Sequence, residues 1–585
     1  MKRYHYYNVI FLLFISSFNA AYASGDLPGT NERIKAFIQV WGMVKYRSLN
    51  AAAGGFHADS IFLASIEKVK SADEKQWTTL ITAVLTDNPG SPSLKPLAVD
   101  SKKVLTKNID YAWIKDNIFS TGIQQQLLAL TKTFNPGKQH WFISEPAKSS
   151  AAPREQTYPD YTFDNEPMNL LALAKAWNAV AYLFPYRYVM DQKLEVTLQQ
   201  LIPVFRGVKS RTEYEKSILM LETAIDDTHA AGFLDQLKTT TTIFDLKYYP
   251  PFTYKIDHDQ IVVKEFLNDS LARANDLKVG DIISAINGVP VHDWLKQRAT
   301  LLPASNQAVK YRLLETSNAL AFSGVNSAEL KLRVKRANQQ LDLSLMLLVR
   351  KDKNVGAIVN KFFTQKYNET QLLKPYEDLP GNIALIRAGY FLDKSLPSDS
   401  GLIAFSQNLN QKKAIIFDMR KYPASPGLFY YYLPMALGKP AFKFARYYAA
   451  DISNPGAFAL KDGVEVYLSK DIKTKMPLYQ GKIVILTDEN TQSMGEWFTM
   501  MLRQINKNTT VFGTQTAGAD GDLKYLNLPG GYQFLFTGNG IFYQDGKETQ
   551  RIGIIPDVLY QPTLQDLISQ KDMQLEKSIE YLTHH

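Results

Sequence analysis

The 585-residue sequence contains no cysteine. Disulfide bonds and a thiol nucleophile are therefore excluded. A lipoprotein is excluded as well, because the chain offers no cysteine to carry the lipid. The sequence also lacks a His-Glu-x-x-His pattern and any comparable cluster of ligand residues. It therefore predicts neither a metal site nor a cofactor.

Positive charge is present but not concentrated. Lys and Arg number 66 against 57 Asp and Glu, which gives a formal net charge of +9. The excess includes Lys2 and Arg3 and is otherwise spread along the chain, so no nucleic-acid partner is expected. No later segment reaches about eighteen uninterrupted apolar residues, which argues against a membrane span. A hydrophobic content of 45% is sufficient for packed cores.

Residues 1–23 have the features of a secretory signal. Lys2 and Arg3 supply the charged start, Val9–Ile15 begins a short apolar run, and Ala21-Tyr22-Ala23 fits a small-x-small cleavage site. The apolar run is too short and broken for a stable membrane span. We therefore expect a soluble mature protein that is exported to the periplasm or the extracellular space.

Residues 24–145 and 160–245 have mainly helical periodicity. Phe37–Tyr46 resembles Leu173–Tyr182, which indicates a weak internal repeat. The Trp and Tyr of each copy are predicted to lie in the core. Between the copies, Pro146–Pro159 is small, polar and bounded by proline, and we interpret it as a linker.

Residues 250–345 change to a β-rich pattern. Gln260–Val263 is predicted to be a strand, and the later string LKVGDIISAINGVPV predicts a strand, an Asn287-Gly288 turn and a second strand. This string resembles the core of a PDZ domain. The resemblance implies binding of extended peptide ends by strand addition. The alternative is a small β-domain without a peptide groove.

Residues 350–570 alternate apolar runs with helical or loop segments, as an α/β sheet does. Three runs are predicted strands: Ile383–Ile386, Ala414–Phe417 and Ile483–Leu486. Ser493 follows the third run and opens an amphipathic helix. The free N–H groups and positive dipole end of a helix N-terminus can stabilise negative charge, as an acyl-transfer site requires. The alternative is that Ser493 only caps the helix.

Five motifs follow one another in this block: Asp418-Met419-Arg420, Ser493 with Glu496, Gly513 with Thr516 and Gly518, Leu528-Pro529-x-Gly531, and Gly553-Ile-x-Pro-Asp557. In this order, from about Glu222 to Val558, they resemble the tail-specific or C-terminal processing serine peptidases, a family that includes the tricorn core and the retinoid-binding protein repeats. The resemblance implies a multidomain α/β protein: a helical N-terminal region, a PDZ-like domain and a ClpP/crotonase-like peptidase core.

The same resemblance implies a catalytic set. The processing branch pairs its serine with a lysine about twenty-five residues later, but Gly518 stands there and Lys524 lies beyond. The tricorn branch uses a histidine that precedes the PDZ domain. Its implied counterparts are Ser493 as nucleophile, His229 as general base, and Thr228 in place of an assisting serine.

The residue that orients His229 is left open by the sequence. Glu548 falls near the tricorn glutamate and is the favoured choice, with Asp226 or Asp227 as alternatives. For the oxyanion hole, the resemblance implies the N–H of Met494 and a donor from the turn after Asp418-x-Arg420.

That turn contains Pro423, which has no N–H, so Tyr422 or Ala424 must donate instead; Tyr422 is favoured. The predicted function is a secreted serine endopeptidase acting on polypeptides, whose tails the PDZ-like domain binds. One alternative is a catalytically weak or inactive homologue that binds peptides or other ligands. An unrelated esterase is the other, but it would favour Gly-x-Ser-x-Gly around Ser493, where Thr-Gln-Ser-Met-Gly stands.

Overall fold

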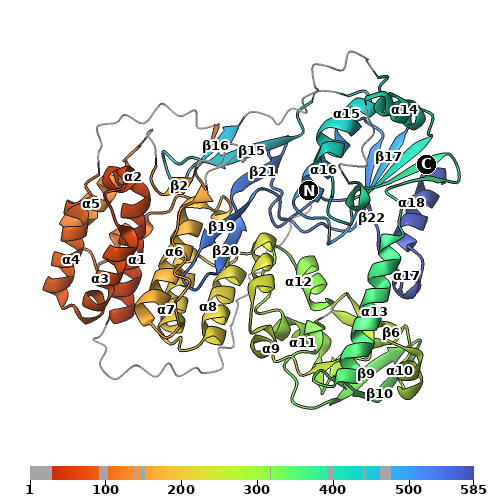
Figure 1. Ribbon diagram of the computed structural model, residues 1–585, viewed down its shortest axis with the longest axis horizontal. Coiled ribbons are helices and arrows are strands. Elements are labelled where there is room, and N and C mark those ends of the chain that lie inside the picture. The colour runs from red at the N-terminus through yellow and green to blue at the C-terminus, as the bar shows by residue number, and fades with distance from the viewer. Residues whose placement is uncertain are drawn as a thin grey trace, which may run out of the picture.

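A computed structural model describes residues 29–90, 103–135, 139–143, 152–316, 318–392, 399–439, 442–461 and 476–584. The predicted signal, residues 1–23, and residues 146–151 of the predicted linker lie outside this part. Helices and several separate sheets make up the described chain, which confirms the predicted multidomain α/β class (Figure 1). Within these ranges no helix is long and apolar enough to cross a membrane.

Helices dominate the N-terminal part, which forms one end of the elongated molecule in Figure 1. Their caps include serine, aspartate and asparagine side chains, the residues that satisfy free N–H groups at helix starts. The elements are α1 (Thr30–Arg47), α2 (Leu49–Ala53), α3 (Ala58–Ser71), α4 (Glu74–Thr86), β1 (Val104–Leu105), η2 (Ala112–Lys115), α5 (Thr121–Thr131), β2 (Phe142–Ile143), β3 (Ala152–Pro153), α6 (Glu166–Leu183), η3 (Arg187–Val189), α7 (Leu194–Arg206) and α8 (Arg211–Ala224).

The internal repeat suggested by the sequence is visible in α1 and α6. The indole N–H of Trp41 and that of Trp177 each donate, at 2.8 Å, to a backbone carbonyl 17 residues further along the chain. Where the two helices meet, Gly42 lies directly against Asn178, which leaves no room for a Cβ at position 42. Both tryptophans are buried, as predicted.

The prediction of a linker at Pro146–Pro159 is wrong for its second half, residues 152–158. Glu155 is buried there, and its carboxylate forms ion pairs with Lys45 of α1 and Lys175 of α6. Buried lysines need an anion nearby, because an unpaired charge away from water is costly. Residues 152–158 therefore pack against both copies of the repeat instead of forming a solvated connection.

The β-rich block contains a sheet of strand order β10-β9-β7-β6-β5, with β8 paired to β7. The predicted strands correspond to β6 and β7, and Asn287 and Gly288 form the predicted turn with φ values of 50° and 80°. The PDZ-like assignment stays a prediction. The elements are η4 (Thr228–Gln236), α9 (Thr240–Ile243), β4 (Tyr248–Tyr249), β5 (Phe252–Asp257), β6 (Gln260–Phe266), α10 (Asp269–Ala274), β7 (Ile282–Ile286), β8 (Val289–Pro290), α11 (Val291–Arg298), α12 (Gln307–Leu314), η5 (Leu320–Phe322), β9 (Glu329–Arg336), β10 (Gln339–Met346) and β11 (Leu348–Val349).

A six-stranded sheet of order β12-β13-β14-β17-β18-β22 forms the centre of the C-terminal block, and only its edge strand β12 is antiparallel. The three predicted apolar strands are β13, β14 and β17. The elements are α13 (Lys353–Gln371), β12 (Tyr376–Leu379), β13 (Ile383–Arg387), η6 (Ala388–Tyr390), α14 (Asp399–Asn410), β14 (Ala414–Asp418), η8 (Leu428–Tyr432), α15 (Leu433–Ala436), β15 (Ala445–Ala450), β16 (Phe458–Lys461), β17 (Lys482–Thr487), α16 (Met494–Arg503), β18 (Thr509–Gly513), β19 (Leu523–Asn527), β20 (Gln533–Thr537), β21 (Asn539–Tyr543), β22 (Val558–Leu559), α17 (Leu564–Ile568) and α18 (Met573–His584).

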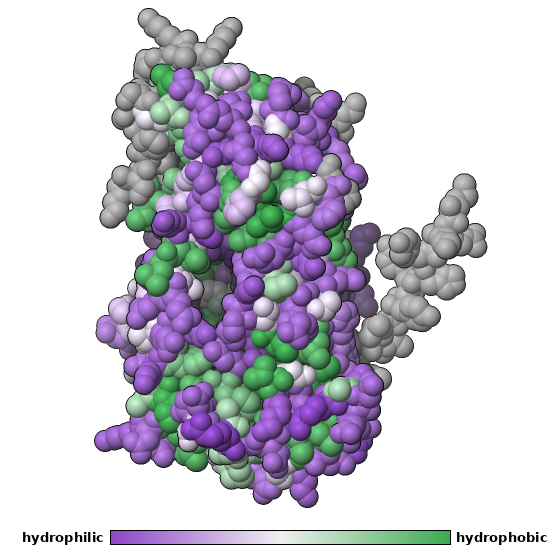
Figure 2. Space-filling model, turned by 90° about the vertical axis from the view of Figure 1, so that its right-hand side faces the viewer, coloured by the Kyte–Doolittle hydropathy of each residue, from purple (hydrophilic) through white to green (hydrophobic). Residues whose placement is uncertain are grey.

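Helices cover both faces of this sheet: α14, α15 and α16 pack on one face and α18 on the other, so the central strands are apolar throughout. The ribbon of β19 and β20 extends to the N-terminal helices, where β20 packs against η4 and α8 (Figure 1). This contact brings η4, which carries His229, to the C-terminal block. Figure 2 shows a largely hydrophilic face with separate apolar patches and a hollow between its upper and lower halves.

Candidate active site

Ser493 lies at the predicted strand-to-helix junction, between β17 and α16. Its backbone has φ 53° and ψ −116°, a conformation that side-chain-bearing residues rarely adopt and that costs about 1–3 kcal/mol. Two hydrogen bonds hold it: the Ser493 N–H donates to the carbonyl of Ala519 at 3.0 Å and to Glu496 Oε2 at 3.2 Å. The strained serine thus stands at the positive end of a buried helix.

Glu496 anchors the loop that supports Ser493. Its buried carboxylate accepts hydrogen bonds from the Thr516 hydroxyl, from the Gly518 N–H at 2.7 Å and from the Ala519 N–H at 3.0 Å. Burial raises the pKa of Glu496, and these hydrogen bonds counteract part of that rise. The Ser-x-x-Glu motif therefore fixes the position of the serine.

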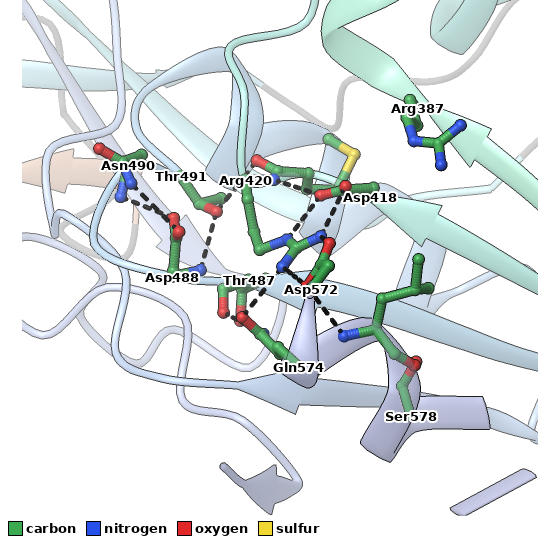
Figure 3. Close-up of polar contacts among 12 residues, drawn as sticks. Arg387, Asp418, Arg420, Thr487, Asp488, Asn490, Thr491, Asp572, Gln574 and Ser578 are labelled. Atoms are coloured by element: carbon green, nitrogen blue, oxygen red, sulfur yellow. Dashed lines mark hydrogen bonds and ion pairs between the residues drawn. The ribbon is translucent and has the colours of Figure 1, made fainter. Parts of the chain in front are cut away.

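The Asp418-x-Arg420 motif forms a clamp at the ends of β14 and β17 (Figure 3). Arg420 donates to both oxygens of Asp418, at 2.9 and 2.8 Å, and to both oxygens of Asp572, at 2.8 and 2.6 Å. Burial alone would raise the pKa of Asp572, but Arg420 holds it below its usual value. The Gln574 amide donates to the carbonyl of Thr487 at 3.0 Å and ties α18 to the same edge.

His229 sits in η4, buried, with its ring against β20. Its Nδ1 lies 2.7 Å from the Thr537 hydroxyl oxygen and 3.7 Å from Asp227 Oδ1. Asp227 is fully buried and accepts from the Thr537 N–H at 2.6 Å, the Thr537 hydroxyl at 3.0 Å and the His229 N–H at 3.1 Å. Burial pushes the pKa of Asp227 upward, yet the hydrogen bonds from His229 and Thr537 leave it below its usual value.

These contacts define which imidazole nitrogen carries the proton. An ionised Asp227 can only accept hydrogen bonds, so the single hydroxyl proton of Thr537 is directed to it. The Thr537 oxygen must then accept from His229 Nδ1–H. In the neutral ring, Nε2 is left unprotonated, and Nε2 is the nitrogen that a general base requires here.

Thr228 joins η4 to the loop that supports Ser493. It exchanges two hydrogen bonds with Ser305 of the β-rich block, at 2.8 and 2.9 Å, and its hydroxyl lies 3.4 Å from the carbonyl of Ala517. The Ala517 N–H in turn donates to the carbonyl of Thr491 at 3.0 Å. Thr228 and Ser493 are therefore connected through a single loop.

The β-rich block also contacts the segment just before the serine. Arg312 of α12 donates to the carbonyl of Glu489 at 2.7 Å and to Gln492 Oε1 at 3.1 Å. Lys255 of β5 pairs with the Glu489 carboxylate at 2.9 Å. The position of this block therefore bears directly on the strained turn at Ser493.

Residues 399–560, which contain the Asp418-x-Arg420 motif and Ser493, match the model of peptidase family S41. The resemblance to C-terminal processing peptidases is thereby confirmed at the level of the family, and the chain is a serine-type peptidase whose substrate class is polypeptide. No curated protein sequence matches the chain.

Several solved structures are similar to this chain at low identity. Mature CPAF in complex with lactacystin is 14% identical, over 72% of this chain and 97% of that one, with a TM-score of 0.49. A putative peptidase from Parabacteroides merdae is 13% identical, over 71% and 96%, with a TM-score of 0.40. The photosystem II D1 C-terminal processing protease is 14% identical, over 69% and 98%, with a TM-score of 0.33.

Glu548 is the residue that the sequence analysis favoured for orienting His229, but its carboxylate contacts other residues. Its carboxylate pairs with Lys107 at 3.1 Å and accepts from the Tyr188 hydroxyl at 2.7 and 2.6 Å. The carboxylate that the structure brings to His229 is that of Asp227, one of the alternatives left open by the sequence. Asp226 accepts from the Asp191 N–H at 2.7 Å instead.

Tyr422 and Met494, the two residues of the predicted oxyanion hole, meet at the N-terminus of α16 through the side chain of Tyr422, whereas the predicted donor was the backbone N–H of Tyr422. The Met494 N–H interacts with the hydroxyl of Tyr422, which also contacts the Ser493 side chain. Ala424, the other candidate for the second donor, uses its N–H for the carbonyl of Ala388 at 3.1 Å. Pro423 packs beside Gly495, so the turn lies directly over the first residues of the helix.

The sequence did not point to Thr537, which contacts His229, or to the buried Asp520. Thr537 ends an apolar strand, where a lone threonine gives no signal of a catalytic contact. Asp520 is buried beside this site; its Oδ1 accepts from the Gly521 N–H, and its Oδ2 has no hydrogen-bond partner among the described residues. Burial raises the pKa of Asp520 well above its usual value.

Lys524 lies on β19, with its alkyl chain packed against Gly538.

Proposed function

We propose that this S41 chain is an exported serine endopeptidase in which Ser493 forms an acyl-enzyme and His229 acts as the general base. Ser493 Oγ attacks the peptide carbonyl carbon while His229 Nε2 takes the hydroxyl proton. The carbonyl oxygen becomes an oxyanion at the N-terminus of α16. The carbon–nitrogen bond then breaks, and the departing amine takes the proton back from Nε2. Water, deprotonated by the same nitrogen, releases the acyl group and restores Ser493.

The relay from Asp227 through Thr537 to His229 Nδ1 is the observation that carries this proposal. It supports a ring in which Nε2 is the basic atom, and the adjacent anion favours the imidazolium that forms during the reaction. Asp227 and Thr537 act as positioning residues. The strained backbone of Ser493 supports its role as a nucleophile rather than as an ordinary helix cap.

Covalent labelling tests the proposal. A fluorophosphonate probe should label the wild-type protein on Ser493, detected by mass spectrometry of the intact chain and of its peptides. Ser493→Ala should abolish the labelling and peptide turnover, with an unchanged thermal transition as the control for folding. A wild-type protein that neither labels nor hydrolyses peptides at neutral pH would instead favour the non-catalytic binding homologue.

The β-rich block is proposed to present substrate tails to the site. Its contacts from Arg312 and Lys255 to the turn before Ser493 support such a coupling. A cavity of about 390 Å³ lies on this block between the turn at Gly288 and strands β9 and β10, and Lys331 and Arg333 line it. Asp342 lines the same cavity and pairs with Arg333 at 3.3 Å, so Lys331 is the cation that would favour a free terminal carboxylate over an amide.

Export is proposed from the basic and apolar leader at residues 1–23. A protein secreted from cells that carry the full gene should begin at Ser24. N-terminal sequencing of the protein from the periplasm or the medium tests this, and an intact Met1 on a protein retained in the cytoplasm would contradict it.

A further inference from the structure

The turn that covers the N-terminus of α16 has few backbone donors to offer. Pro423 has no N–H, and the Ala424 N–H is engaged by the carbonyl of Ala388. The turn is nevertheless held firmly in place. Met419 N–H donates to Leu486 at 3.0 Å, the Met419 carbonyl accepts from the Thr491 hydroxyl at 3.0 Å, and Pro423 packs beside Gly495. A side chain from this turn can therefore approach the helix N-terminus with a defined geometry.

Tyr422 provides that side chain. Its hydroxyl interacts with the Ser493 side chain and with the Met494 N–H, so it lies where a substrate carbonyl oxygen would be polarised. The Tyr422 side chain remains 50% exposed, which leaves the phenol free to move aside when a substrate arrives. Burial raises the pKa of Tyr422, and the nearby charge of Asp520 adds to the rise. The phenol consequently stays protonated at neutral pH and can donate a hydrogen bond.

We propose that the hydroxyl of Tyr422, not its backbone N–H, is the second oxyanion donor of this site. Without substrate, the hydroxyl rests on Ser493 and the Met494 N–H. When the carbonyl oxygen enters, it takes the hydrogen bond from Met494, and the phenol shifts to donate its proton to the same oxygen. The proton remains on Tyr422 throughout, because the role is stabilisation of the oxyanion. This inference rests on the proposed acyl-enzyme at Ser493.

Tyr422→Phe tests the hydroxyl with the ring retained. The variant should lower kcat for peptide hydrolysis about 10²- to 10³-fold, the usual effect of losing one oxyanion donor, while KM changes by less than about threefold. The affinity for a peptide boronic acid, whose tetrahedral adduct carries the oxyanion, should fall by a similar factor. Tyr367→Phe is the matched control, since this tyrosine on α13 is 64% exposed and lies outside the turn. Both variants should show the thermal transition of the wild type.

The outcomes separate this inference from the function on which it rests. An active wild type with an equally active Tyr422→Phe would overturn the role of the hydroxyl and leave Ser493 catalysis intact. A faster Tyr422→Phe would also overturn it, because the phenol would then be shown to block the site. If neither protein labels with fluorophosphonate or cleaves peptide, the acyl-enzyme itself is refuted and the inference falls with it.

Discussion

Replacing Asp227 by asparagine keeps the shape of the side chain and removes its charge. At present both oxygens only accept: Oδ2 from the Thr537 N–H, and Oδ1 from the backbone N–H of His229, from the Thr537 hydroxyl and, at 3.5 Å, from the Gln550 amide. An asparagine has one oxygen and one NH₂ group, so one of these positions must become a donor. The Thr537 N–H makes the shortest of these hydrogen bonds, at 2.6 Å against 3.1 Å for the His229 N–H, and so favours the oxygen at Oδ2, which places the NH₂ group at Oδ1.

The Thr537 hydroxyl would then accept from the asparagine and turn its own proton to His229 Nδ1. This arrangement stabilises the tautomer in which Nε2 carries the proton and cannot act as a base. We expect kcat to fall about 10³-fold. This is less than the roughly 10⁴-fold loss in the chymotrypsin-type triad, because Nδ1 and Oδ1 are 3.7 Å apart and Thr537 mediates the contact. The backbone N–H of His229 would then face the NH₂ group and lose its acceptor. This loss should lower the free energy of unfolding by about 1–3 kcal/mol.

The assay is steady-state hydrolysis of a peptide substrate between pH 5 and 9, with kcat and KM determined separately. Glu548→Gln is the matched control, since that carboxylate contacts Lys107 and Tyr188 rather than His229. It should change kcat by less than about threefold. The reasoning is refuted if Asp227→Asn retains more than a tenth of the wild-type kcat, or if Glu548→Gln is the more damaging change.

Further perturbations address the general base His229, the Arg420 ion pairs, the buried Asp520 and the C-terminus of the peptide substrate. His229→Ala should lower kcat at least about a hundredfold, whereas Lys524→Met should have little effect; the reverse order would favour a lysine base. Arg420→Ala should lower the free energy of unfolding by about 2–4 kcal/mol in urea titrations, because two carboxylates lose their shared partner, and an unchanged midpoint would refute the clamp. Because the folded-state pKa of Asp520 is raised, wild-type stability falls as pH rises above the unfolded value near 3.9. Asp520→Asn should remove up to about 1.4 kcal/mol per pH unit of that fall, and parallel stability curves would contradict this. Peptides ending in a free Val, Leu or Ala should be cleaved faster than their amidated forms, and equal rates would leave the β-rich block a spacer.

The sequence predicted the strands and the junction at Ser493 because their signals are local. Ile483–Leu486 is an apolar run, and the helix behind it has a clear amphipathic period, so β17 and α16 follow from pattern alone. The turn at Asn287 and Gly288 was equally predictable from the sequence, since two consecutive positive φ angles favour these residue types.

The partners of His229 were harder to predict, because they depend on pairing between distant strands. Thr537 reaches the imidazole only because β20 packs against η4, more than 300 residues away in the chain. Burial of Glu155 between two lysines likewise could not be inferred from a polar, proline-bounded stretch. The family resemblance pointed to Glu548, whereas Asp227 lies two residues before the histidine it contacts.

A crystal structure of the protein inactivated by a peptidyl phosphonate tests the central claim most directly. We predict continuous density from Ser493 Oγ to phosphorus, with His229 Nε2 about 2.6–3.2 Å from that oxygen or from the leaving-group position. His229 Nδ1 should still contact Thr537. A phosphonate on another residue, or a His229 ring that points away from a modified Ser493 while Lys524 contacts it, would contradict the account.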